Sequence, residues 1–344
     1  MRIAYILSWD LSYQDGVSKK VLSQVRTWEL LGHRVHVFST VTKPPTQGPP
    51  NVSYYHKTAT NRFFVSRELL TDVREFGADV CYLRLEGYNA TQRRLLRSLP
   101  SVVEVNTDLR KELQLQLAQT RSVRALVALL LYVVHWTLMR RSVDGIVGVT
   151  KELAQLYAKN ATTYVYIPNS IDLSQVSRAK QPAHATSDQI HVGCLFSRQQ
   201  PWHGVDKVQV LARKLGPDFQ FHVIGGESHS IRRDGNITYY PFLSDVDYRR
   251  VLSKCSVCVG SLALYRKGIR EAAPLKVREY IAMGFPVIVG YKEAFLCTGD
   301  VPEWFLELQE HEVQDCFPKA SLQRIETFCR NMRNRIVTPL EAKP

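Results

Sequence analysis

The sequence lacks a cysteine framework. Its seven cysteines are scattered and odd in number, which indicates reduced thiols in a cytoplasmic protein rather than a disulfide-bonded secreted domain. Cys255 and Cys258 lie in an apolar run with no second pair and no histidine cluster. Burial therefore accounts for them better than metal binding or redox chemistry. The apolar start, residues 1–8, is too short for a secretory signal peptide.

The sequence also lacks the usual nucleic-acid-binding patterns, because no RNP, zinc-finger or basic-zipper motif occurs in it. The chain is nevertheless basic, with a formal net charge of +13, of which residues 1–168 carry +9 and residues 169–344 carry +4. A basic half favours an anionic partner, which leaves nucleic acid, an anionic membrane surface or phosphorylated small molecules. The missing motifs disfavour the first, so we expect no nucleic acid among the partners.

A membrane-spanning run is missing as well. Residues 125–139 carry no formal charge, but as a helix they would cover about 22 Å, short of the roughly 30 Å hydrocarbon core. Two interpretations of residues 121–141 remain open: a helix buried in the N-terminal domain, or a face that lies on anionic lipid. The arginines that flank the apolar run are Arg121, Arg124, Arg140 and Arg141.

The length predicts two domains, because 344 residues exceed what one hydrophobic core usually serves. Short apolar strands alternate with helical segments, and the alternation restarts near residue 190, which is typical of open parallel sheets. We therefore expect an α/β chain of two doubly wound, Rossmann-like domains. The expected boundaries are 1–170 for the N-terminal domain, 171–189 for a linker, 190–318 for the C-terminal domain and 319–344 for a terminal helical segment.

The most informative stretch is residues 268–290, in which Glu271 and Glu279 stand eight positions apart. Pro274 between them suits the start of a helix, because its missing N–H would be unpaired there anyway. Gly284 suits the end of that helix, and the apolar residues behind it predict a buried strand.

The N–H groups of Leu275 and Lys276 would then lie at the positive end of the helix, where a phosphate is favoured. Both glutamates could reach a ligand lying across that end. A pyrophosphate with a polyhydroxylated group on each side fits this arrangement. The alternative is an ordinary amphipathic helix with two solvated glutamates.

Together with the run Ala-Met-Gly-Phe-Pro-Val-Ile behind it, this stretch resembles the donor-site signature of glycosyltransferase family 4. That family contains retaining nucleotide-sugar glycosyltransferases of the GT-B fold, in which two Rossmann-like domains face each other across a cleft. The resemblance implies that Glu271 contacts the donor sugar, that Leu275 and Lys276 bind the diphosphate, and that Glu279 binds the ribose. It also implies that residues 319–344 cross back to the N-terminal domain.

A second part of the resemblance follows the first strand of the second half. The family binds the diphosphate there with an arginine, matched by Arg198, and with a lysine before a glycine, where this sequence has His203. Histidine is only partly protonated near pH 7, whereas arginine is always charged. Either His203 acts as a donor with its pKa raised by the diphosphate, or the step depends on Arg198 and another cation such as Lys276. In the alternative, Trp202 and His203 are a packing pair.

In the first half the resemblance rests on Gly16, which opens a helix after the first strand, with Lys19 and Lys20 as basic neighbours. In the family this glycine approaches the donor phosphate or the acceptor, although a plain strand-to-helix turn is the alternative. Asn106 and Asp108 follow the strand 101–105 at the edge where ligands bind on parallel sheets. The family often has a histidine near this point, so Asn106 is the candidate in its place, unless both residues cap the next helix.

Asp245 and Asp247 invite comparison with a metal-binding D-x-D motif, but they follow Ser244 at a helix start, so capping is the better explanation. We therefore expect no required metal. Gly225, Gly226 and Glu227 form a glycine-rich turn after a strand, which either lets the backbone approach the nucleotide or is an ordinary turn.

The resemblance thus implies a retaining, metal-independent glycosyltransferase of the hexosyltransferase type, with a nucleotide-diphosphate-sugar as donor substrate and no other cofactor. The implied acceptor is a glycan or a lipid-linked molecule bound mainly by the N-terminal domain, in polysaccharide or glycolipid biosynthesis. The expected location is the cytoplasm, at the periphery of the inner face of the membrane. Two alternatives stay open: a nucleotide-sugar epimerase or hydrolase on the same fold, and a catalytically degenerate binding protein recruited to the membrane by its basic half.

Overall fold

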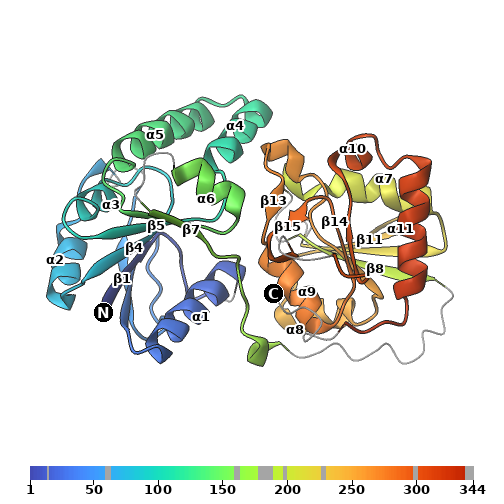
Figure 1. Cartoon of the computed structure of the whole chain (residues 1–344), viewed down its shortest axis with the longest axis horizontal. Coiled ribbons are helices and arrows are strands. Elements are labelled where there is room, and N and C mark those ends of the chain that lie inside the picture. Colours follow the sequence, from blue (N-terminus) through green and yellow to red (C-terminus); the bar gives the residue numbers. More distant parts are fainter. Residues whose placement is uncertain are drawn as a thin grey trace. The chain divides into compact units, whose positions relative to one another are not determined.

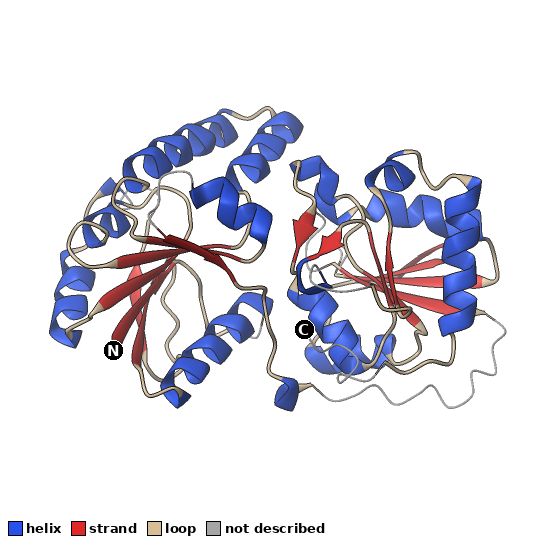
Figure 2. Cartoon of the chain, viewed as in Figure 1, coloured by secondary structure: helices blue, strands red, loops and turns tan. Residues whose placement is uncertain are grey.

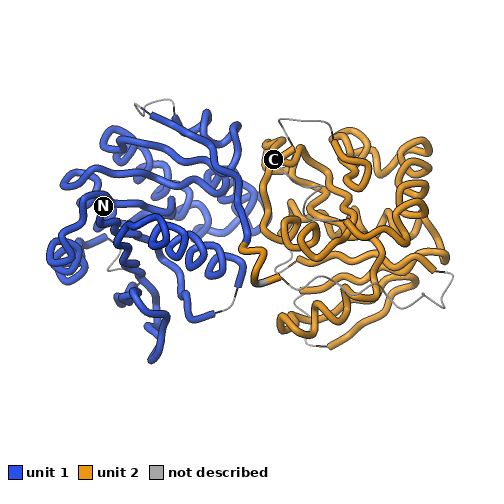
Figure 3. Tube along the Cα trace, turned by 60° about the horizontal axis from the view of Figure 1, so that its bottom comes forward, with its two compact units in different colours: residues 1–171 blue, residues 172–344 orange. Residues whose placement is uncertain are grey.

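The computed structural model describes residues 1–13, 15–58, 63–158, 163–176, 189–196, 200–225, 230–296 and 301–337. The chain divides into two compact units, unit 1 with residues 1–171 and unit 2 with residues 172–344 (Figure 3). Each unit has its own seven-stranded sheet. The predicted α/β fold with two Rossmann-like domains is confirmed.

The sheet of unit 1 is entirely parallel and has the strand order β3-β2-β1-β4-β5-β6-β7. The order reverses between β1 and β4, so this unit has a topological switch point of the kind at which open α/β sheets bind ligands. Its strands are β1 (Arg2–Leu7), β2 (Arg34–Val41), β3 (Val52–His56), β4 (Val80–Arg84), β5 (Ser101–Val105), β6 (Gly145–Gly148) and β7 (Thr163–Tyr166).

Helices cover both faces of this sheet (Figure 1, Figure 2). On one face α1 packs through Val21 and Val25 onto Tyr5 and its neighbours. On the other face α2, α3, α5 and α6 pack onto a second apolar cluster around Ile6 and Val103. The helices of unit 1 are α1 (Gly16–Leu30), α2 (Arg67–Phe76), α3 (Ala90–Leu95), α4 (Leu109–Thr120), α5 (Val123–Met139) and α6 (Lys151–Tyr157).

The sheet of unit 2 has the strand order β10-β11-β9-β8-β12-β14-β16 and is parallel except for the edge pair β10 and β11. Its order reverses between β8 and β12, which gives a second switch point. The strands are β8 (Ile190–Leu195), β9 (Phe219–Ile224), β10 (Arg232–Asp234), β11 (Ile237–Tyr240), β12 (Val257–Val259), β14 (Val287–Val289) and β16 (Phe305–Glu307). A separate parallel pair joins β13 (Glu271–Ala272) to β15 (Lys292–Glu293).

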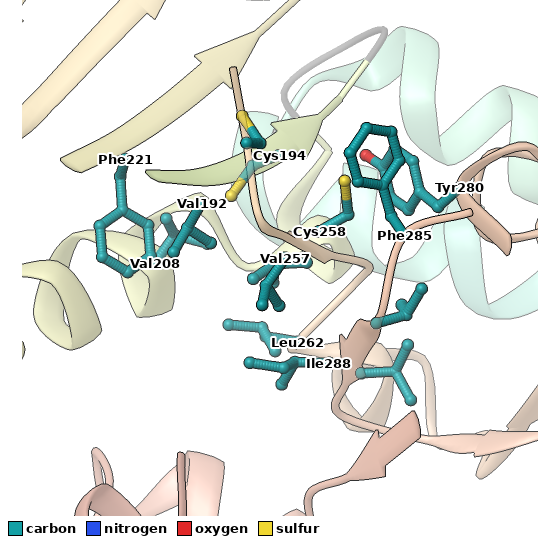
Figure 4. Close-up of a cluster of buried hydrophobic side chains, with 14 of the residues drawn as sticks. Val192, Cys194, Val208, Phe221, Val257, Cys258, Leu262, Tyr280, Phe285 and Ile288 are labelled. Carbon is teal, nitrogen blue, oxygen red and sulfur yellow. The ribbon is translucent and has the colours of Figure 1, made fainter. Parts of the chain in front are cut away.

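One continuous apolar core holds unit 2 together, and Figure 4 shows its centre, where Val192, Val257 and Ile288 come from adjacent strands. Cys194 and Cys258 lie in this core and are completely buried, as the sequence predicted for Cys258. The helices of unit 2 are α7 (Val205–Leu215), α8 (Asp245–Leu252), α9 (Leu275–Met283), α10 (Glu310–Gln314) and α11 (Lys319–Met332), with short 3-10 helices η3 (Leu173–Gln175), η4 (Pro201–His203), η5 (Leu264–Lys267) and η6 (Ala294–Leu296).

The terminal helix α11 belongs to unit 2. Ile325 and Cys329 are buried in its core, and Arg330 forms an ion pair with Asp218. The predicted return of residues 319–344 to the N-terminal domain therefore concerns only the end of the segment. Residues beyond 337 lie outside the described part of the chain, so the return stays a prediction.

Gly148 at the end of β6 lets the α6 backbone approach this strand closely. A Cβ atom at Gly148 would lie 2.4 Å from the backbone nitrogen of Ala154 and 2.8 Å from its Cβ. We expect Gly148→Ala to lower the free energy of unfolding by about 2 kcal/mol and Tm by about 5 °C, because the helix must shift away from the sheet. Calorimetry of the full chain measures this. Gly87→Ala is the matched control, since nothing lies within 4 Å of the added methyl group. Equal Tm values for both variants would contradict the close approach.

Candidate functional site

Helix α9 presents an uncapped N-terminus. Its N-cap residue is Pro274, with extended backbone and no side-chain hydrogen bond to the helix. The N–H groups of Val277 and Arg278 bond to the Pro274 carbonyl oxygen at 3.1 and 3.4 Å, whereas the earlier N–H groups have no acceptor within a helix. The predicted end at Gly284 is also present, with φ of 96°. The first turn of α9 is therefore suited to an anion.

The Lys276 amine lies beside this turn without a polar partner. Its Nζ atom is buried, makes no hydrogen bond within the described part of the chain, and lies 4.3 Å from the centre of the Phe196 ring. Burial lowers the pKa of Lys276 to about 7. A buried cation is normally paired. The unpaired amine next to an open helix N-terminus thus marks a place where an anionic group would be stabilised.

Phe196, directly after β8, brings a second candidate to the same place. The His203 ring stacks on the Phe196 ring with a centroid distance of 5.3 Å and an interplanar angle of 17°. The backbone holds His203 in position, because Leu262 N–H donates to its carbonyl oxygen at 3.0 Å. His203 and Lys276 therefore contact one aromatic ring, although they are 73 positions apart in the sequence.

The two glutamates of the signature are both half-buried. Glu271 lies in β13, three positions before Pro274, and Glu279 lies in the second turn of α9. Tyr248 of α8 donates a hydrogen bond from its hydroxyl to Glu279 Oε1 at 3.2 Å. This bond orients the Glu279 carboxylate. The sequence did not single out Phe196 or Tyr248, because the contacts that give them their roles are tertiary.

A buried ion pair between α9 and β15 supports β13, the strand that contains Glu271. Arg278 of α9 lies 3.1 Å from Glu293 of β15, and its guanidinium lies 3.9 Å from the centre of the Phe295 ring. Glu293 is fully buried and also accepts a hydrogen bond from the Tyr291 hydroxyl at 3.2 Å. Since β15 pairs with β13, this contact ties the position of Glu271 to that of α9.

In unit 1 the candidate Gly16 is exposed and begins α1. The carboxylate of Asp15 caps this helix and accepts a hydrogen bond from Ser18 N–H at 2.8 Å. Trp9 donates a further bond from its indole nitrogen to the same carboxylate at 3.0 Å. Asp15 thus occupies the position that a phosphate would take at this helix N-terminus, and the role of Gly16 stays a prediction.

Asn106 lies in a buried polar network at the carboxyl end of β5. Its amide oxygen accepts from Lys20 Nζ at 2.5 Å, and its amide nitrogen donates to Glu104 Oε2 at 2.9 Å. Lys20 also pairs with Glu104 at 2.7 Å. Burial acts to raise the pKa of Glu104, but Lys20 and Arg84 outweigh it and hold that pKa below its usual range. The network fixes the orientation of Asn106.

Some of the remaining candidates lie within the described residues and others lie outside them. Arg198, Gly226 and Glu227 lie outside the described residues. Ser244 caps α8 by accepting from Asp247 N–H at 3.2 Å, as the capping interpretation of that motif requires. Within the described ranges, no group of three or more His, Cys, Asp or Glu side chains could hold a metal ion. In the same ranges, no helix is both long and apolar enough to cross a membrane.

No protein-family model matches the chain. No curated protein matches it either.

Solved structures match the chain over almost its whole length. Sucrose-phosphate synthase from Thermosynechococcus elongatus is 16% identical, with a TM-score of 0.67 and with 97% of this chain and 92% of that chain covered. An alpha-glucosyltransferase in complex with UDP and a 13-mer DNA is 13% identical, with a TM-score of 0.61 over 97% and 92% of the chains. HepE from Anabaena, in complex with UDP, is 12% identical, with a TM-score of 0.59 over 97% and 93%.

One of these structures contains DNA, which does not fit our expectation of no nucleic-acid partner for this chain, so that expectation is not supported. At these identities the similarity establishes the architecture. The chain has the two-domain GT-B fold of these glycosyltransferases.

Proposed function

We propose that this chain is a retaining glycosyltransferase that moves a sugar from a nucleotide-diphosphate-sugar to an acceptor. The observation that carries the proposal is the unpartnered, buried Lys276 amine beside the open N-terminus of α9, between the two glutamates of the signature. A sugar nucleotide fits this site, because its diphosphate would pair with the cation and its hydroxyl groups would donate hydrogen bonds to the carboxylates. UDP in two of the structural neighbours favours the same class of donor.

In the proposed complex the diphosphate lies on the first turn of α9. The N–H groups of Leu275 and Lys276 and the Lys276 amine bind it, with Arg198 and His203 as further donors. Glu271 accepts from the hydroxyl groups of the sugar. Glu279, oriented by Tyr248, accepts from those of the ribose.

The chemistry then depends on charge at the leaving group. As the bond between the anomeric carbon and the diphosphate oxygen breaks, negative charge grows on the diphosphate. Cations already in place lower the barrier most at that point, since their solvation does not have to reorganise. The acceptor hydroxyl attacks from the face that the diphosphate leaves, and its proton passes to the departing phosphate oxygen. The product keeps the anomeric configuration, and no metal is assigned a role.

Unit 1 is the proposed acceptor domain, with a glycan or a lipid-linked molecule as acceptor. Asn106, held by Lys20 and Glu104, is proposed to contact the donor sugar. Thermal unfolding of the full chain with UDP-, GDP- and ADP-sugars tests the donor, because a ligand that binds the folded state raises Tm. No stabilisation by any sugar nucleotide would refute the proposal. Rapid release of free sugar without an acceptor would instead indicate the hydrolase alternative.

We expect Glu271→Ala and Arg198→Ala each to lower kcat/KM for the sugar nucleotide by at least about tenfold while Tm stays within a few degrees. The first removes an acceptor of sugar hydroxyl bonds, and the second removes a cation from the leaving group. Steady-state kinetics with the donor found by thermal unfolding measures this. Glu75→Ala and Arg97→Ala are matched controls, because both residues are exposed on unit 1. Near-normal rates in both site variants would overturn the assignment.

We expect Lys276→Met to raise the Tm of the ligand-free protein and to abolish most of its stabilisation by UDP. The pKa of Lys276 is about 7 when folded and 10.5 in the reference state. The unfolded chain therefore binds the extra proton between these values, and wild-type stability should rise with pH across that window. In the variant that slope should disappear. Calorimetry at several pH values measures both effects.

The same pKa predicts that UDP affinity of the wild type falls as pH rises from about 6 to 8.5, because only the protonated amine pairs with the diphosphate. Lys254→Met is the control, since Lys254 is exposed, and it should change neither property. A destabilised Lys276→Met variant with normal UDP binding would show that the amine has only a structural role.

A further inference from the structure

Helix α5 of unit 1 carries an exposed apolar face. Residues near every third or fourth position point away from the sheet, whereas Tyr132, His135 and Met139 on the opposite side are buried. Of the two sequence interpretations, burial therefore describes only one side of this helix. An exposed apolar patch of this extent is typical of an interaction surface. Its members are Val123, Leu126, Val127, Leu130, Val133, Val134 and Leu138, with exposed fractions between 39% and 77%.

A pocket of about 440 Å³ opens beside this face, between α4, α5 and α6. Val133 belongs both to the exposed apolar face and to the pocket lining, so the two features are continuous. The helices α4 and α5 lie next to each other in unit 1 (Figure 1). The lining consists of Asp108, Arg110, Lys111, Gln114, Tyr132, Val133, Trp136, Thr137, Arg140, Leu156 and Tyr157.

The pocket has an excess of positive charge. Arg110, Lys111 and Arg140 line it, and no ion pair involves any of them within the described part of the chain. The Nε atom of Arg140 is buried and makes no hydrogen bond with any described residue. A buried guanidinium nitrogen without an acceptor is costly, so an anionic oxygen in this pocket would be stabilised.

Asp108 is the only acidic residue of the lining, and its charge is already partly compensated. Its Oδ1 atom accepts from Lys111 N–H at 3.3 Å, at the N-terminus of α4, and from the Tyr157 hydroxyl at 3.4 Å. Tyr132 and Tyr157 share a further bond of 2.8 Å between their hydroxyl groups. Burial raises the pKa of Tyr132 to about 12, so it stays neutral. The second carboxylate oxygen retains the capacity to accept from a hydroxyl group of a ligand.

We propose that this pocket binds the head group of an anionic membrane lipid, a phosphodiester that carries hydroxyl groups, while the exposed apolar face of α5 enters the membrane interface. The phosphate pairs with Arg110, Lys111 and Arg140, and the hydroxyl groups donate hydrogen bonds to Asp108. A soluble anion would leave the apolar face uncovered, whereas a lipid accounts for both features at once. The net charge of +9 on unit 1 attracts the same surface. This inference concerns binding alone and does not rest on the proposed sugar transfer.

Sedimentation of the full chain with phosphatidylcholine vesicles, with and without phosphatidylglycerol, tests the charge. We expect binding only with phosphatidylglycerol, and a loss of about 25-fold in affinity for Arg110→Gln/Lys111→Gln, because each basic residue near the surface contributes about fivefold. The matched control is Arg94→Gln/Arg97→Gln, which removes two exposed charges from the same unit outside the pocket. An equal loss in both double variants would show that only the overall charge matters and would overturn the pocket.

The head group is tested with phosphatidylethanol, which has the same charge as phosphatidylglycerol but no head-group hydroxyl. We expect the wild type to bind phosphatidylglycerol at least about threefold more tightly, and Asp108→Asn to lose this preference, because an amide is a weaker acceptor than a carboxylate. Asn keeps an oxygen for the helix cap, so the variant should fold. A wild type without preference would remove the role of Asp108 and refute the hydroxyl-bearing head group.

The apolar face is tested with Leu130→Gln/Val134→Gln, which we expect to lower vesicle binding at least about tenfold without lowering Tm, because both side chains are exposed. Val246→Gln is the control, because Val246 is a still more exposed valine, on α8 of unit 2. Unchanged vesicle binding in the double variant would overturn the proposal. The proposal would also be overturned if sedimentation equilibrium showed a dimer of the wild type and a monomer of the double variant, since a second copy would then cover the face. If glycerol 3-phosphate stabilised the folded chain against thermal unfolding as much as vesicles do, the ligand would be a soluble anion instead.

Discussion

The candidate site depends on one buried positive charge, that of Lys276, which no described residue neutralises. Two other buried cations in the described part of the chain have carboxylate partners: Lys20 pairs with Glu104, and Arg278 with Glu293. Lys276 instead has the face of Phe196, and a ring offers a cation much less than a carboxylate does. The pKa of Lys276 is lowered to about 7 because its amine is buried without a carboxylate partner among the described residues. A bound anion would remove this cost.

The surrounding contacts keep this place fixed before any ligand arrives. Tyr280 of α9 is completely buried and accepts from Leu195 N–H at 2.6 Å, which ties the helix to the end of β8. Phe196 follows directly, so the ring under the amine moves with the strand. On the other side, the Arg278 and Glu293 pair ties α9 to β15 and thus to Glu271. The contacts proposed for a diphosphate and a sugar would thereby be preorganised, which is what electrostatic stabilisation of a transition state requires.

Local patterns predicted what depends on local chemistry, and little beyond it. Pro274 and Gly284 fixed α9 almost to the residue, and alternation of strands and helices was enough for the two α/β units. The contacts of Phe196 and Tyr248, in contrast, are made across the fold, so no local pattern predicts them. For α5 the sequence is apolar all round, so only its neighbours decide which side is buried.

The replacement of the family's usual lysine by His203 gains a physical explanation from this arrangement. His203 and Lys276 contact the same ring, so beside the permanent charge proposed for Arg198 the proposed diphosphate would meet an amine, that of Lys276, whose pKa is about 7. A bound diphosphate would raise the pKa of Lys276 and draw a proton to its amine. When the nucleoside diphosphate leaves, the Lys276 amine returns to a pKa of about 7 and can release that proton. The charge of Lys276 would then be complete only while the anion is present, which favours transition-state binding without making product release equally slow.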